Sequence, residues 1–230
     1  MLSQPRTILD LSHPLQSGQV PACAGHPCFA ASSVLSISKG NDANVHALAL
    51  GTHTGTHLDA PSHFFTDGTP VDALDLSLLV AAPAIVADVR HKGTPHARIV
   101  FEDIASAVDE ARRREVRMLL LCTGWSHNWG KGNYTDHPFL DVNAARRLWD
   151  AGVRVIGLDT QSPDQVAPGF EGKDVHLVFL GSGGIIVENL NGLERILERG
   201  WANVVVSMLP LRLAGLDGSP LRAVAWEGSN

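Results

Sequence analysis

Long apolar runs are missing from this sequence. No stretch reaches the roughly 18–20 apolar residues that a membrane-spanning helix needs, and the segment from Met1 to Arg6 contains no hydrophobic core of a secretory signal. We therefore expect neither a membrane partner nor export, which makes the cytoplasm the expected location.

Cysteine is scarce. The chain has 3 cysteines, Cys23, Cys28 and Cys122, and an odd, sparse set argues against a disulfide framework and fits a reducing cytoplasm. Cys23, His26 and Cys28 lie close together in the sequence and could be read as metal ligands. Because no distant pair of ligands accompanies the two thiols, a plain loop is the preferred interpretation.

A concentrated positive surface is also absent. The formal net charge is -6 and no long stripe of Lys and Arg is present, so nucleic acid is disfavoured as a partner. The one basic run, residues 112–114 with Arg117, falls where a helix is predicted to end. There the positive charge complements the negative end of the helix dipole.

The composition that remains is that of an ordinary globular protein. Of the 230 residues, 44% are hydrophobic and 18% are charged, which argues against disorder. No repeat, low-complexity tract or Pro/Ser-rich linker divides the chain. We therefore expect a single domain over residues 1–230.

Hydrophobic patterning indicates a β-rich first half followed by units of helix and strand. Short strands bounded by Gly, Pro, Asn and Asp are predicted at residues 8–11, 33–37, 45–50 and 85–89. Beyond residue 101, helices and strands are predicted at 104–111, 118–122, 142–150, 153–158, 193–197 and 203–208. Asn191 with Glu194 is expected to cap the last helix, and Gly200 to end it. This order predicts a compact mixed α/β fold.

The chemically informative segment is Gly51 to Phe64. Within eleven residues it contains three histidines and one aspartate, namely His53, His57, Asp59 and His63. The glycines, threonines and proline between them disfavour a helix. In an extended chain side chains alternate with a period of two, so all four are expected on one face.

These four side chains suit a catalytic divalent metal ion. Neutral imidazoles and one carboxylate bind zinc, and they would also accept manganese. The three ligands His53, His57 and Asp59 leave a coordination position open for water, whose pKa a metal can lower to about 7. His63 lies four residues beyond Asp59, near the reacting atoms, and is interpreted as the proton-transfer group.

The segment resembles the signature of the cyclase-type metal-dependent hydrolases, which include bacterial kynurenine formamidases and isatin hydrolases. The pattern His-x-Gly-Thr-His-x-Asp-x-Pro-x-His matches residues 53–63 without a gap. Residues 10–15, 157–164 and 217–224 are similar to the family's opening, central and closing segments. The resemblance implies a swivelling β/β/α fold, with two packed sheets and flanking helices. It also implies hydrolysis of an aryl formamide or an isatin-like lactam by metal-activated water.

A second metal site is implied by the resemblance alone. His176 and Glu188 have the family's spacing of twelve residues and would reach a second ion that Asp59 bridges. From the sequence itself, Glu188 would be interpreted as a solvated carboxylate near the start of a helix. We therefore expect one or two divalent ions per subunit, with Zn²⁺ ahead of Mn²⁺.

The resemblance also implies a homo-oligomer, either a dimer or a tetramer. In relatives, the loop after the first strand helps to close a neighbour's active site. Here that loop is residues 20–29, which depart from the family's acidic Pro-Gly-Asp pattern and contain Cys23, Gly25 and His26 instead. Substrate contacts from this loop are therefore left open.

Substrate contacts are expected from two further segments. The segment 123–130 follows a strand, where ligand-shaping loops lie in α/β folds, and its Trp125 and Trp129 could stack on an aromatic substrate or simply pack. Gln161 and Ser162, in the segment similar to the family's central loop, are further candidates. The Thr-Gly-Trp sequence is more like that of isatin hydrolases than of strict formamidases.

Other functions remain open at this point. The same fold could serve as a non-catalytic metal-binding or scaffold protein, although such a protein would not need His63. A lactone hydrolase or cyclase would use the same ligands. A nucleotide- or redox-cofactor enzyme rests only on the glycines of residues 181–184, which lack the register of a dinucleotide-binding loop.

Overall fold

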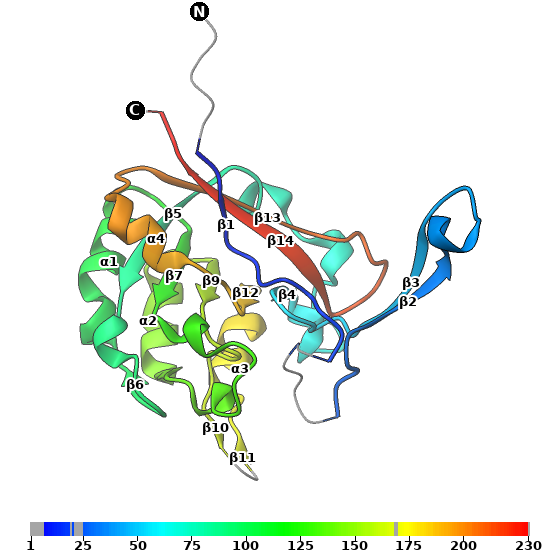
Figure 1. Cartoon of the computed structure of the whole chain (residues 1–230). Coiled ribbons are helices and arrows are strands. Elements are labelled where there is room, and N and C mark those ends of the chain that lie inside the picture. The colour runs from blue at the N-terminus through cyan, green and yellow to red at the C-terminus, as the bar shows by residue number, and fades with distance from the viewer. Residues whose placement is uncertain (1–6, 19, 21–24, 168–169, 230) are drawn as a thin grey trace, which may run out of the picture.

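Figure 1 shows the computed structural model, which describes residues 7–18, 20, 25–167 and 170–229. Its centre is one large sheet, and none of its helices is both long and apolar enough to span a bilayer. The strands of this sheet are β1 (Leu9–Asp10), β4 (His57–Asp59), β5 (Ala82–Asp88), β7 (Met118–Cys122), β9 (Val155–Leu158), β12 (Ile185–Glu188), β13 (Val204–Pro210) and β14 (Gly218–Glu227).

The large sheet closes on itself. Its strand order is β1-β14-β13-β5-β7-β9-β12-β4, and β4 also pairs with β14, so that seven strands form a ring with β1 at the edge of β14. The mixed α/β fold is as the sequence predicted. The two packed sheets that the resemblance implied are hydrogen-bonded to each other, so that they form one barrel-like sheet.

Helices connect consecutive strands in the parallel part of the sheet, which is formed by β5, β7, β9 and β12. These connecting helices are α1 (Phe101–Arg113), α2 (Val142–Asp150) and α3 (Asp174–Gly181), and a further helix, α4 (Leu193–Arg199), leads from β12 to the antiparallel strand β13. The predicted limits of β7 and α2 are confirmed to the residue. Arg112 and Arg113 do lie in the last turn of α1, as the charge pattern indicated.

One local prediction was wrong and one helix was missed. Asn191 does not cap α4, because the N-cap is Gly192 in a left-handed conformation with no side-chain cap; Gly200 does end the helix, as expected. The helix α3 was not predicted at all. Its residues are apolar on nearly every side, so they show no helical alternation of polar and apolar positions.

The core has two parts, one on each face of the sheet. Along β7, Met118, Leu120 and Cys122 join a cluster that includes buried side chains from all eight strands. Leu119 and Leu121 point the other way and pack against α1, α2 and α3. This two-sided burial explains why β7 is an unbroken apolar run rather than an alternating one.

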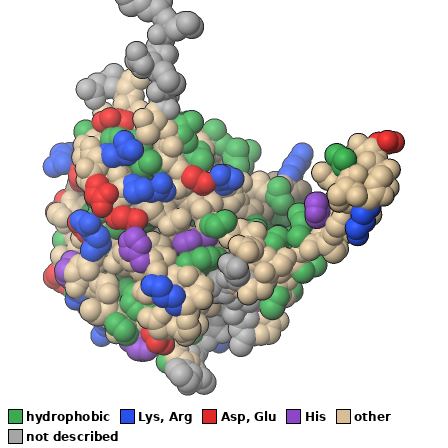
Figure 2. Space-filling model, in the orientation of Figure 1, with side chains coloured by type: hydrophobic (Ala, Val, Ile, Leu, Met, Phe, Trp, Pro, Cys, Tyr) green, Lys and Arg blue, Asp and Glu red, His purple; other side chains and the backbone are tan. Residues whose placement is uncertain are grey.

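One hairpin leaves the body of the molecule. It consists of β2 (Ala30–Leu35) and β3 (Val45–Ala49), which pair antiparallel, and it projects as an arm in Figures 1 and 2. Every residue in both strands is exposed, including Val34 at 60% and Leu48 at 62%. Two smaller pairs are β6 (Arg98–Ile99) with β8 (Phe139–Leu140) and β10 (Val166–Ala167) with β11 (Phe170–Glu171).

Candidate metal centre

The motif segment is not one extended strand, and that prediction was wrong. Only His57 to Asp59 form a strand, β4, while the residues before it make turns and Pro61 to His63 form a short 3₁₀ helix. Gly55 breaks the extended chain with a φ of 66°, and a Cβ there would collide with the side chain of Leu15. The four side chains nevertheless converge, because the turn and the 3₁₀ helix fold back over β4.

The first group of ligand atoms gathers around Asp59 Oδ1. This oxygen lies 2.6 Å from His53 Nδ1 and 3.3 Å from His57 Nε2. His57 and Asp59 alternate with buried Leu58 on β4, so both side chains reach the same face of the strand. The three side chains can offer one atom each to a single metal ion.

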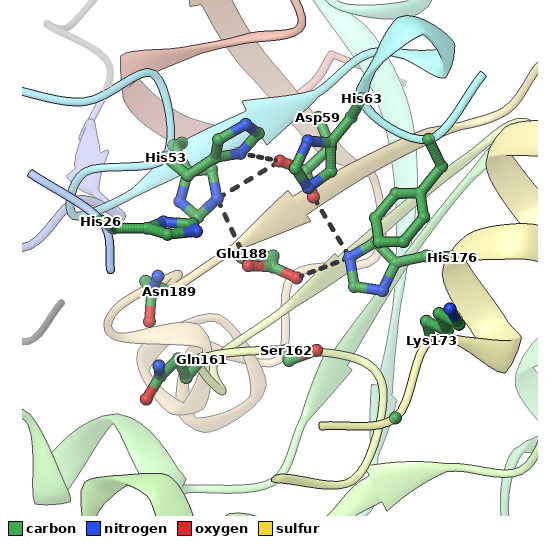
Figure 3. Close-up of a pocket in the computed structure, with 13 residues that line it drawn as sticks. His26, His53, Asp59, His63, Gln161, Ser162, Lys173, His176, Glu188 and Asn189 are labelled. Carbon is green, nitrogen blue, oxygen red and sulfur yellow. Dashed lines mark hydrogen bonds and ion pairs between the residues drawn. The ribbon is translucent and has the colours of Figure 1, made fainter. Parts of the chain in front are cut away.

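The second group gathers around the other oxygen of the same carboxylate. Asp59 Oδ2 lies 3.5 Å from His176 Nε2, and Glu188 Oε1 lies 3.3 Å from the same nitrogen. His176 comes from α3 and Glu188 from the end of β12, which pairs with β4 so that Glu188 is opposite His57. Figure 3 shows Asp59 between the two groups.

The buried acids of this centre favour a cation. Asp59 Oδ2 and Glu188 Oε1 are buried and, apart from their ion-pair contacts with His176 Nε2, have no hydrogen-bond partner among the described residues, which is costly for an ionised carboxylate. Burial alone would lower the pKa of His57, but the charges and hydrogen bonds of Asp59 and Glu188 raise it to about 10. The same kind of balance raises the pKa of His176. The site therefore attracts positive charge, and a divalent ion with imidazole and carboxylate ligands fits it.

The ring nitrogens that point away from the centre are all hydrogen-bonded. His53 Nε2 lies 2.9 Å from Asp217 Oδ2, His57 Nδ1 lies 2.8 Å from the Gly55 carbonyl, and His176 Nδ1 lies 2.7 Å from Asp164 Oδ2. Metal-binding histidines almost always have such an acceptor, which fixes the tautomer and the ring orientation. The donor set is therefore organised as a metal centre requires.

Two of these acceptors were missed by sequence reasoning. Asp164 also accepts hydrogen bonds from the backbone N–H groups of Val175 and His176, at the start of α3. Asp217 immediately precedes β14. Both lie at the ends of segments that carry the family resemblance, and that was the only signal pointing to them.

Asn189 was also missed, although it lines the cavity. Its φ of 56° is unusual for a residue other than glycine, and its side-chain amide donates to the Gly55 carbonyl over 2.9 Å. Tyr134 donates its hydroxyl to Asn189 Oδ1 at 2.7 Å. These contacts fix the position of the Gly55 carbonyl, which in turn orients the His57 ring through its hydrogen bond with Nδ1.

His63 lies beside the first group without belonging to it. Its ring centre is 3.9 Å from that of His53, and its Nδ1 is 3.1 Å from Asp217 Oδ2. Burial, opposed in part by Asp59, lowers the pKa of His63. Burial would raise the pKa of Asp217, but its hydrogen bond with His53 and the charge of that ring hold it at about 2. At neutral pH His63 is therefore a neutral imidazole next to an ionised carboxylate.

A cavity of about 230 Å³ opens over the centre. It is lined by both groups of ligands, by His63 and by several further side chains, namely His26, Phe64, Gln161, Ser162, Lys173 and Asn189. Gln161 and Ser162 thus line the cavity, and their contact with substrate stays a prediction. As for the alternative thiol site, Cys23 lies outside the described residues and Cys28 is exposed.

The two tryptophans do not line this cavity. Trp125 is buried and donates its indole N–H to the carbonyl of Tyr134 at 2.8 Å. Trp129 stacks on His13, with ring centres 4.1 Å apart and nearly parallel planes. Trp125 is therefore a packing residue, whereas the half-buried Trp129 packs on His13 and also lines a second cavity with Gln16 and Lys131. Contact of a tryptophan with substrate stays a prediction.

Known proteins are similar to this chain in sequence or in fold. A family model described as a putative cyclase matches residues 9–165. The kynurenine formamidase of Bacillus mycoides is 34% identical, with 94% of this chain and 95% of the relative covered; that of Delftia acidovorans is 31% identical, with 95% and 97% covered. Isatin hydrolase A from Labrenzia aggregata superposes with a TM-score of 0.81 at 24% identity, with 97% of this chain and 94% of that chain covered.

Proposed function

This chain belongs to the cyclase family, and we propose that it is a metal-dependent hydrolase that cleaves an amide or cyclic amide at a C–N bond other than a peptide bond. The observation that carries the proposal is the convergence of five ligand residues and His63 on one cavity. The ligands are His53, His57, Asp59, His176 and Glu188. The proposal treats residues 1–230 as one domain, because strands from both ends of the chain share the large sheet.

The reaction adds water across the scissile bond. A divalent ion held by the centre would polarise the substrate carbonyl and lower the pKa of a bound water to about 7. His63 takes one proton from the attacking water onto its Nε2 and passes it to the leaving nitrogen, so the C–N bond breaks to give an amine and a carboxylic acid, which then releases its own proton to solvent at neutral pH. Gln161 and Ser162 orient the substrate from the opposite wall.

The chemistry of the cavity favours a small aromatic amide. Among the described residues that line the cavity, Phe64 is the one aromatic side chain other than histidine, and it offers a flat apolar surface next to the imidazoles. A volume of about 230 Å³ accommodates one substituted ring with its amide. An aryl formamide, as the names of the formamidases suggest, and an isatin-like lactam both have this shape.

The native metal is proposed to be Zn²⁺, with Mn²⁺ as the alternative. Imidazole nitrogens dominate the first group, and such ligands suit zinc, while a bridging carboxylate next to a second acid also suits manganese. Since Asp59 faces both groups, two ions per subunit are proposed.

The arm supports the proposal of a homodimer or larger homo-oligomer. A two-stranded hairpin with no body to pack against is at best marginally stable in water. The exposed Val34, Ile37 and Leu48 would be shielded if a second copy covered the arm.

We also propose a cytoplasmic location, with which the free cysteines Cys28 and Cys122 agree.

A metal-binding scaffold on the same fold is the competing function. A panel of an aryl formamide, isatin and a small lactone, assayed with Zn²⁺- or Mn²⁺-loaded protein, separates the possibilities. Metal-dependent turnover of the formamide or of isatin supports the proposal. Turnover of the lactone alone would assign a lactone hydrolase, and metal binding without any turnover would assign the scaffold.

A further inference from the structure

One oxygen of Asp217 joins the first metal ligand to the proton-transfer group. Asp217 Oδ2 lies 2.9 Å from His53 Nε2 and 3.1 Å from His63 Nδ1. The two imidazoles lie against each other, with ring centres 3.9 Å apart, and both present a nitrogen to this oxygen. Because an ionised carboxylate only accepts hydrogen bonds, each of these nitrogens carries its proton.

The backbone places this carboxylate firmly. The carbonyl of Asp217 accepts a hydrogen bond from the N–H of Ala60 at 2.9 Å, and the next residue, Gly218, pairs with Asp59. A Cβ on Gly218 would come within 2.8 Å of the His53 ring and 2.7 Å of the Leu58 carbonyl. The close approach of the His53 ring to this strand therefore requires glycine after Asp217.

We propose that Asp217 is a positioning residue that fixes His63 with its proton on Nδ1, so that Nε2 faces the cavity as the proton acceptor. The inference rests on the proposed function, in which His63 moves the proton. Asp217 is the hydrogen-bond partner of the His63 ring among the described residues, and the neighbouring aromatic rings, Phe64 edge-on at 4.7 Å and His176 at 6.1 Å, do not fix which nitrogen carries the proton. Without the carboxylate, the ring could turn or exchange tautomers.

A metal site at the same place is the rival interpretation, because His53, His63 and Asp217 could also hold an ion. The tautomer of His53 argues against it. When Nδ1 of His53 donates its lone pair to an ion held by the first group, the ring is neutral and its proton must be on Nε2. Only Asp217 and His63 then remain, and two ligands do not make a catalytic or structural site of the usual kind.

The first test reads the tautomer of His63 without any substrate. In zinc-loaded protein labelled with ¹⁵N-histidine, we expect the His63 resonances of the Nδ1–H form. In Asp217→Ala they should change to the Nε2–H form or to an average of both. A wild-type His63 already protonated on Nε2 would overturn the proposal, whatever the outcome of the substrate panel. This readout therefore separates a failure of the inference from a failure of the proposed function.

The second test is a double-mutant cycle on kcat at saturating metal. Asp217→Asn should lower kcat roughly 10²-fold with little change in KM, as expected for lost acid–base catalysis. In the His63→Ala background most of this loss should disappear, because Asp217 acts mainly through His63, and only the smaller part that it contributes by holding His53 should remain. A full 10²-fold loss in that background would show that Asp217 acts elsewhere.

Asp164→Asn is the matched control for this cycle. Asp164 holds His176 as Asp217 holds His53, but it makes no contact with His63 in the structure. Asp164→Asn should therefore lower kcat by the same factor in the wild-type background and in the His63→Ala background. Metal stoichiometry completes the test: Asp217→Asn should bind as many ions as wild type at saturation, and the loss of one ion would make Asp217 a ligand.

Discussion

The carboxylate of Asp59 reaches across the centre to His176, with its Oδ2 3.5 Å from Nε2 of that ring. The same carboxylate presents Oδ1 to His53 at 2.6 Å. One short side chain, buried to 1% exposure, thus connects ligands from a turn and from a helix. Its loss should affect both groups together.

Asp59→Ala is therefore expected to lower bound metal at both groups and to abolish turnover. Elemental analysis of the purified variant measures the first effect and the formamide or isatin assay the second. Asp59→Asn serves as the volume-matched control and should also bind metal weakly, since it lacks the charge. A fully loaded and active Asp59→Ala protein would refute the assignment.

His176→Ala and Glu188→Ala should lower the metal stoichiometry while leaving the fold intact. Both residues belong to the second group, and Glu188 Oε2 also lies 3.3 Å from His57 Nε2. Asp164→Asn should have a milder effect, a roughly 10–100-fold weaker affinity, because it orients His176 without touching the ion. Titration with Zn²⁺, with circular dichroism as the check on folding, measures all three. Unchanged stoichiometry in both alanine variants would remove them from the site.

The sequence predicted those parts of the fold that depend on local pattern. The apolar run of β7 and the amphipathic spacing of α2 were correctly bounded because each element carries its signal within its own residues. The apolar sequence of α3 carries no such signal, and its helical state depends on burial against α2 and β12. The pairing of β4 with β14, which closes the large sheet, joins residues far apart in the chain, and no local pattern encodes it.

The same distinction holds for the site. His53, His57, Asp59 and His63 could be recognised because they lie within one short segment, although the predicted strand was partly a turn and a 3₁₀ helix. His176 and Glu188 were reached through family spacing alone. Asp164, Asn189 and Asp217 were missed, because each acts by a hydrogen bond to a residue distant in sequence.

The exposed arm should be covered by a second copy in solution. Light scattering is expected to give a mass well above the 24.6 kDa of one chain. Placing charge on the arm with Val34→Asp and Leu48→Asp should shift the protein towards the monomer. Leu76→Asp, at another exposed apolar residue but on the body, is the control and should leave the mass unchanged. A monomeric wild type at working concentration would contradict the proposal.

His13 should make the protein less stable in mild acid. Its ring is buried against Trp129, its Nε2 has no hydrogen-bond partner among the described residues, and burial lowers its pKa to about 4. An unfolded histidine titrates near 6.5, so between about pH 6.5 and 4 the unfolded chain binds more protons. The free energy of unfolding therefore falls as the pH falls through this window, by about 3 kcal/mol at most.

His13→Phe keeps a flat ring against Trp129 but cannot take up a proton. Urea unfolding at about pH 7.5 and pH 4.5 should show a smaller loss of stability in this variant than in wild type. Loss of metal in acid affects both proteins, so the difference between them reports His13. His127→Phe changes an exposed histidine instead and should behave as wild type. Equal acid sensitivity of His13→Phe and wild type would contradict the prediction.

The proton-transfer role of His63 gives the most direct test of the mechanism. His63 lines the cavity but stands outside both groups of ligands around Asp59. His63→Ala should therefore keep its metal and lower kcat by roughly 10²–10⁴-fold. KM should change less, because the interaction is made mainly in the transition state.

The dependence on the leaving group makes the His63 prediction specific. An aryl formamide whose amine leaves readily needs little protonation of its nitrogen, so the loss of kcat in His63→Ala should shrink along a series of such substrates. A ligand role would instead reduce bound metal and lower turnover of every substrate alike. Metal loss in His63→Ala would thus make His63 a ligand, and an unchanged kcat would show that the proton moves by another route.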